Sequence, residues 1–166
     1  MQGDGEEAFE RLVDRHAGDI HRLAAAIVGI DDAGDVTQEV LILAWRKLPS
    51  LRDPDRAAAW IRRIVVNRCM DHGRHASRRV RTIPMLPGDD RLQHSDGPEV
   101  VGFDQELEQA LRSLPVEQRA VLALHYAADL TIADVAATLD LPVGTAKSRL
   151  NAALTRLRTK LGERRP

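Results

Sequence analysis

Aromatic side chains are scarce in this chain, which has two Trp, two Phe and one Tyr among its 166 residues. Sheets favour aromatic and β-branched residues, whereas helices favour residues such as Ala, Leu and Arg, which are abundant here. No alternation of β-branched and polar residues persists over five positions. The sequence therefore predicts an all-α fold.

The chain is also poor in cysteine and in long apolar stretches. Its one cysteine, Cys69, excludes an internal disulfide and suits a reducing compartment. No apolar run approaches the roughly 18 residues that a membrane-spanning helix needs. The acidic N-terminus lacks the basic-then-apolar pattern of a secretion signal. We therefore expect a cytoplasmic protein that has no membrane partner.

The net charge of −1 hides a strong asymmetry along the chain. Residues 1–39 hold ten acidic residues against three arginines, whereas residues 62–81 hold seven arginines against one acidic residue. Residues 147–165 again hold seven basic residues against one acidic residue. Two separated basic patches of this kind predict two contacts with one nucleic acid.

Hydrophobic periodicity predicts helices in two groups. The first group covers about 5–28, 32–48 and 53–81, and the second about 103–113, 115–127, 131–139 and 142–161. Residues 82–102, with six Pro or Gly, predict a flexible linker rather than a long loop within one domain. We therefore expect two small helical domains, 1–81 and 103–166.

The last two helices have the spacing of a helix-turn-helix. Thr131 is placed to cap the first of them, with Asp134 three residues on, and Asp140 stands at the turn, where a left-handed residue is often needed. The final helix has an apolar seam, and its other positions suit a DNA major groove: Thr145, Lys147, Ser148, Arg149, Asn151 and Arg156. The alternative is a solvated amphipathic helix with ordinary surface charge.

Four motifs, in this order, resemble the extracytoplasmic-function (ECF) group of bacterial sigma factors over about residues 8–160. They are DVTQE at 35–39 followed by AW at 44–45, the set Trp60, Ile64, Asn67, Asp71 and Arg74, LPVEQRAV at 114–121, and GTAKSR at 144–149. The resemblance implies a protein that binds core RNA polymerase and directs promoter-specific initiation. It implies no enzymatic activity and no cofactor.

The resemblance also implies roles for individual residues. Asp35, Gln38 and Glu39 would bind the clamp of the largest polymerase subunit, and the second domain would meet the flap of the second-largest subunit. The −10 element would be read by Arg52, Asp53, Arg63, Asn67, Asp71, Arg74 and Arg78, and the −35 element by the six residues of the final helix. Ala152 departs from the family, which commonly has a basic residue there. An anti-sigma factor would be a further partner.

Other interpretations stay open at this point. Asp35, Gln38 and Glu39 also fit an ordinary solvated helix face, and Asp71 could serve to orient Arg74. A stand-alone helix-turn-helix regulator or an interaction adaptor are alternative functions. The string of Cys69, His72 and His75 has no fourth ligand nearby, so we do not predict a metal site. Both tryptophans are expected in the core.

Overall fold

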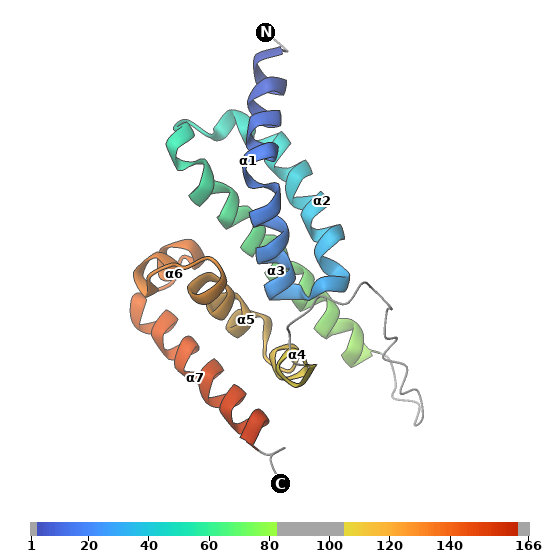
Figure 1. The fold of residues 1–166 in the computed structure, drawn as a ribbon, viewed down its shortest axis with the longest axis vertical. Coiled ribbons are helices and arrows are strands. Elements are labelled where there is room, and N and C mark those ends of the chain that lie inside the picture. The colour runs from blue at the N-terminus through green and yellow to red at the C-terminus, as the bar shows by residue number, and fades with distance from the viewer. Residues whose placement is uncertain (1–2, 83–104, 163–166) are drawn as a thin grey trace.

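The structure, a computed structural model, describes residues 3–82 and 105–162, and within these ranges its regular elements are helices (Figure 1). The elements are α1 (Gly3–Val28), α2 (Ile30–Lys47), α3 (Ala57–Thr82), α4 (Gln105–Arg112), α5 (Val116–Leu122), α6 (Ile132–Leu139) and α7 (Val143–Gly162). Short turns of 3₁₀-helix, η1 (Leu48–Ser50) and η2 (Pro54–Arg56), separate α2 from α3. The all-α prediction is confirmed.

The breaks in the first half lie where the sequence predicts them. Gly29 ends α1 with φ 93°, a conformation that favours glycine, and its carbonyl accepts a hydrogen bond from the Ala33 amide at 3.1 Å. After η1, the Asp53 carboxylate accepts the Asp55 amide at 3.0 Å and caps the turn that leads into α3. These local devices fix the chain direction between the three helices.

Helices α1, α2 and α3 pack on one another around a set of aliphatic side chains. The largest of these that are fully buried are Ile20, Ile27, Val36, Val40, Val65 and Val66. They recur at helical spacing, so each helix turns one apolar face inward. The first half is therefore a three-helix bundle. No helix in residues 3–82 or 105–162 is long and apolar enough to cross a membrane.

The helix-turn-helix of the second half forms as predicted. The Thr131 hydroxyl accepts the Asp134 amide at 3.1 Å and donates to the Asp134 carboxylate at 2.8 Å. Asp140 ends α6 in the left-handed region with φ 53° and ψ 50°, where its amide bonds back to Ala137 at 3.4 Å. Helix α7 packs on α4, α5 and α6. A small core lies between α4, α5 and α7: Ala110, Leu114, Leu122, Ala153 and Leu157.

The sequence did not predict that the two halves pack against each other. Helix α5, the π-helical turn η3 (Ala123–Ala127) that continues it, and α6 contact α1 or α3 of the first half. One hydrophobic cluster therefore runs through both halves and includes Val65 and Cys69 together with Ala120 and Leu124. We call this contact the seam. The predicted linker lies almost wholly outside the described residues, and the domain boundaries stay predictions.

One expected core residue is not buried. Trp45 is 47% exposed and meets Phe9 edge-on, with ring centroids 5.0 Å apart and an interplanar angle of 73°. Its neighbour one turn earlier, Ile42, is 52% exposed. The prediction that Trp45 lies in the core was wrong, because the preceding residue, Ala44, faces the core in that turn of α2 and is fully buried. Trp60 is half-buried and packs against the core as expected.

Candidate nucleic-acid and partner interfaces

Helix α7 presents a polar face to solvent on the outer side of the second half (Figure 1). Ala146, Ala153 and Leu157 are buried and hold the helix down. Of the residues predicted to read the −35 element, Lys147, Ser148, Asn151 and Arg156 are exposed, whereas Thr145 and Arg149 are half-buried. None of the six side chains has a polar partner within the described ranges. The arrangement leaves donors and acceptors free for base edges and phosphates.

Helix α3 carries a second polar face, formed by Asn67, Asp71 and Arg74, which are all exposed. Asp71 and Arg74 lie 3.9 Å apart as an ion pair, so Asp71 also orients Arg74. Arg63 and Arg78, predicted for the same element, are exposed on this helix as well. The spacing therefore brings this predicted set together on one helix.

Two of these arginines already contact the second half. The Arg63 guanidinium donates to the Ala137 carbonyl of α6 at 3.2 Å, and Arg74 meets the Glu117 carboxylate of α5 at 3.4 Å. Neither contact could be predicted from the sequence, because the partners are 74 and 43 residues apart in the chain.

The segment before α3 has a mixed role. Arg52 and Asp53 are both exposed, in line with a contact surface. The Asp53 carboxylate is partly engaged, however, because it accepts the Asp55 amide and lies 3.7 Å from Arg56. Asp53 therefore has a structural function as a cap in addition to any contact it makes with DNA.

The predicted clamp-binding face of α2 divides into two kinds of residue. Asp35 and Gln38 are exposed, whereas Glu39 is half-buried and forms an ion pair with Arg68 of α3. A hydrogen bond from Arg68 to Glu39 raises the pKa of the arginine, against the lowering effect of burial. Ile42 and Trp45 extend the exposed face along the helix. Their exposure was missed, although both fall at helical spacing from Gln38.

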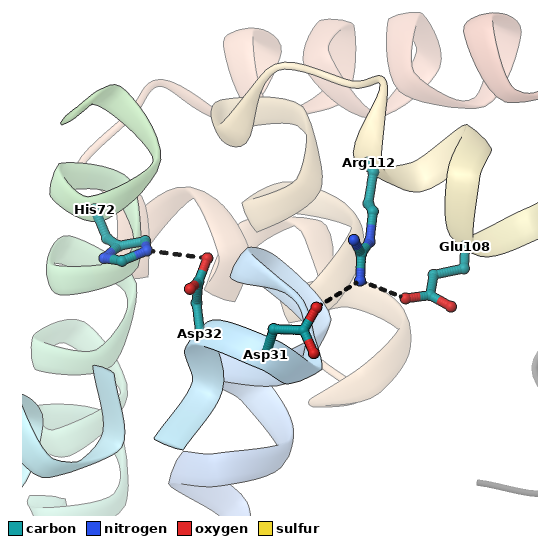
Figure 2. A network of polar contacts seen from close by, with 5 residues as sticks. All are labelled: Asp31, Asp32, His72, Glu108 and Arg112. Carbon is teal, nitrogen blue, oxygen red and sulfur yellow. Dashed lines mark hydrogen bonds and ion pairs between the residues drawn. The ribbon is translucent and has the colours of Figure 1, made fainter. Parts of the chain in front are cut away.

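A polar network ties the start of α2 to α3 and α4 (Figure 2). His72 of α3 lies 3.2 Å from the Asp32 carboxylate, and Arg112 of α4 lies 3.6 Å from Asp31 and 2.7 Å from Glu108. Asp31 and Asp32 were not singled out from the sequence. They fix the N-terminal end of α2 to both halves of the molecule.

Cys69, His72 and His75 do not converge. Cys69 is fully buried, and desolvation raises the pKa of its thiol to about 12. His72 is engaged with Asp32, and His75 is exposed. Among residues 3–82 and 105–162, no three His, Cys, Asp or Glu side chains are grouped as metal ligands would be.

Gly73 is a residue whose role only the structure reveals. It is buried in the middle of α3, and a Cβ built on it would lie 2.6 Å from Cγ2 of Val116 in α5. A glycine inside a helical pattern lowers helix stability, so its presence indicates close packing at that position, and this could have been read from the sequence. That Val116 is the residue packed against it could not be predicted, because Val116 lies in the other half of the chain.

The two halves correspond to two known families of domain. The family model "Sigma-70 region 2" matches residues 12–79, and "Sigma-70, region 4" matches residues 104–157. The first covers α3 and the exposed face of α2, and the second covers the helix-turn-helix.

Similar proteins cover nearly the whole chain. The ECF RNA polymerase sigma factor SigM of Mycobacterium tuberculosis is 36% identical over 156 residues, which are 93% of this chain and 78% of SigM. The ECF RNA polymerase sigma-E factor of Haemophilus influenzae is 30% identical and covers 97% of this chain and 90% of its own length.

A solved structure has the same fold. The sigma factor RpoE of Bartonella quintana, determined with the anti-sigma factor NepR, aligns with a TM-score of 0.68 at 25% identity and covers 95% of this chain and 98% of RpoE. With both domains, their order and nearly full-length relatives in agreement, the chain belongs to the ECF group of the sigma-70 family, and it is a sigma factor of promoter-specific transcription initiation.

Proposed function

We propose that this sigma factor docks on core RNA polymerase through α2, reads the −10 element with α3 and reads the −35 element with α7. The observation that carries the proposal is the exposed polar face of α7, which has no polar partner in the part of the chain that the structure describes. Lys147, Ser148 and Asn151 are exposed side by side there, near the start of the helix. A recognition helix reads base edges with its N-terminal residues, and these three side chains are in that position.

On α2, we assign the contact with the polymerase clamp to Asp35 and Gln38. Both are exposed, and neither has a polar partner in the described part of the chain. Glu39 is engaged with Arg68, so its main role is to hold α2 against α3. The apolar side chains of Ile42 and Trp45 continue the same surface.

On α3, Asn67 is the best candidate for a base contact. It is exposed, has no polar partner among the described residues, and carries both a donor and an acceptor. Arg63, Arg74 and Arg78 supply positive charge for phosphates, and Arg52 and Asp53 extend the surface at the N-terminal end.

The protein acts by binding and performs no reaction of its own. It works in the cytoplasm, where core polymerase is found. An anti-sigma factor is a further partner, since the similar sigma factor RpoE was solved with the anti-sigma factor NepR.

The test is run-off transcription by core polymerase on a pool of genomic promoter fragments, with and without this protein. We expect specific new transcripts only when the protein is present. Their start sites give the −10 and −35 sequences. Unchanged transcription together with absent polymerase binding would contradict the proposal.

A pair of α7 variants tests the assignment of the −35 contact. Lys147→Ala removes an exposed lysine side chain from the first turns of the helix, and Lys160→Ala removes another exposed lysine side chain from its last turn. We expect Lys147→Ala to lower promoter-specific transcription about tenfold, the loss that corresponds to about 1.4 kcal/mol. Lys160→Ala should leave transcription near the wild-type level. Equal effects of the two variants would argue against α7 as the reading helix.

A further inference from the structure

Helix α7 lies on the outer side of the second half, and its burial pattern defines which residues point outward (Figure 1). Ala146, Ala153 and Leu157 are buried and mark the inner line of the helix. At about 100° per residue, the opposite line runs through Gly144, Ser148, Asn151, Ala152 and Thr155. All of these residues are exposed, and we call them the reading face. A DNA groove that receives the first turns of α7 therefore meets the reading face first.

The residues of the reading face are short and uncharged. None of them carries the guanidinium or ammonium group that typically binds O6 and N7 of guanine. Their small side chains also allow the helix to approach the base edges closely. The groups that project from the middle of this face, the amide of Asn151 and the methyl of Ala152, therefore dominate what it can recognise.

Positive charge lies on the two flanks of the reading face. Lys147 lies on one side, and Arg149 and Arg156 lie on the other, each roughly 80° to 120° around the helix from the centre of the face. Lys147 and Arg156 are exposed, Arg149 is half-buried, and none has a polar partner among the described residues. Phosphate backbones border a groove on both sides, so long cationic side chains in these places position the helix, whereas the centre reads bases.

The chemistry of Asn151 and Ala152 favours A·T base pairs. An asparagine amide donates to N7 and accepts from N6 of adenine, whereas guanine offers two acceptors and leaves the amide oxygen without a partner. An unpaired polar group at a desolvated interface costs free energy. The methyl group of alanine makes an apolar contact with the C5 methyl of thymine, which cytosine lacks.

We propose that Asn151 and Ala152 set the base preference of this sigma factor and select neighbouring A·T pairs in the −35 element. The inference rests on the proposed role of α7 and adds the bases that the helix takes. The hydroxyls of Ser148 and Thr155 both donate and accept, so they tolerate any base pair. Lys147, at the edge of the face, reaches a phosphate or a guanine further along, so the preference is confined to the pairs opposite Asn151 and Ala152.

The test uses a promoter that the holoenzyme transcribes, with its −35 element randomised and each version linked to a transcribed barcode. For the wild type, we expect enrichment of neighbouring A·T pairs. Asn151→Ala should lower the preference for adenine over guanine about tenfold at one position. Ala152→Arg should replace thymine by guanine at the other, since arginine binds O6 and N7 of guanine. Thr159→Ala is the matched control, an exposed position nearer the C-terminal end of α7, and should leave both preferences unchanged.

A change in the DNA isolates the methyl contact. Deoxyuridine in place of the preferred thymine removes only the C5 methyl group and keeps the base pairing. We expect the wild-type holoenzyme to lose transcription about fourfold, as for one apolar group that is no longer buried. The Ala152→Arg holoenzyme, which has no such contact, should lose nothing. An equal response of the two holoenzymes would contradict the role of Ala152.

The inference is overturned if G·C pairs are enriched at both positions or if no base is preferred. It is also overturned if Asn151→Ala keeps the full A·T preference, because the preference would then come from the sequence-dependent shape of the DNA. These results leave the sigma function intact, since the transcripts still depend on the protein. Absence of transcripts from the whole pool of genomic promoter fragments would instead reject the sigma roles, and this inference with them.

Discussion

At the scale of single residues, burial decides what a reactive group can do. Cys69 is the one thiol of the chain, and it is fully enclosed between the first half and α5. Desolvation is the main reason that its pKa is raised to about 12, and the nearby Arg119 only partly offsets it. The thiol is therefore neutral across the physiological pH range and acts as a small apolar side chain.

This raised pKa predicts a loss of stability in alkali. The folded thiol keeps its proton to about pH 12, whereas the unfolded thiol ionises near its ordinary value of 9.0. The contribution of this pKa difference to the free energy of unfolding is fully present below pH 9. It is lost as the pH rises from 9 towards 12, by up to about 1.4 kcal/mol per pH unit. Urea unfolding at about pH 8, 9 and 10 measures it. Cys69→Ala should show a shallower decline than the wild type, and identical declines would contradict the assignment.

At the scale of elements, helix boundaries follow from local signals, whereas contacts between helices do not. Gly29, Asp53, Thr131 and Asp140 end or begin helices where their backbone preferences require it. The π-helical turn η3 was not predicted, and it occurs where the chain of α5 reaches α1. Apart from Arg52 and Asp53, which lie in the segment before α3, the predicted −10, −35 and clamp residues fall on the expected helices. The contacts that Glu39, Arg63 and Arg74 make nevertheless depend on partners far away in the chain.

The division of the α2 face gives a prediction about two neighbouring acids. Asp35→Asn removes an exposed charge that has no partner among residues 3–82 and 105–162. It should change the free energy of unfolding by less than about 0.5 kcal/mol while weakening binding to core polymerase. Glu39→Gln breaks the ion pair with Arg68 and should cost up to about 1 kcal/mol of stability, because the pair is only partly exposed. Urea midpoints and polymerase pull-downs measure the two effects. Equal losses of stability would contradict the division.

At the scale of the whole molecule, the shared cluster couples the two halves. The small core of the second half is supplemented by residues of α5 and α6 that belong to the same buried cluster as the three-helix bundle. A domain that buries part of its apolar surface against a neighbour depends on that neighbour for stability. The two halves should therefore unfold together.

Both tryptophans lie in the first half, which makes this coupling measurable. Tryptophan fluorescence follows the first half alone, whereas far-UV circular dichroism follows the helices of both. We expect the two urea transitions of the wild type to coincide, as for a single cooperative unit. In Gly73→Gln the transitions should separate, since the added side chain meets Val116 and opens the seam. Separate transitions in the wild type would show that the halves are independent.

The sequence by itself determined the helical class, the order of the helices, the helix-turn-helix and the family, because periodicity, caps and short motifs act over a few residues. Only the tertiary structure decided that the halves pack on each other, that Glu39 is paired with Arg68 whereas Asp35 is exposed, and that Gly73 lies at a contact between the halves. Pairs such as Arg63 and Ala137, 74 residues apart, leave no local pattern. Their proximity follows from how complete helices pack, and hydrophobic packing depends on shape across the whole molecule.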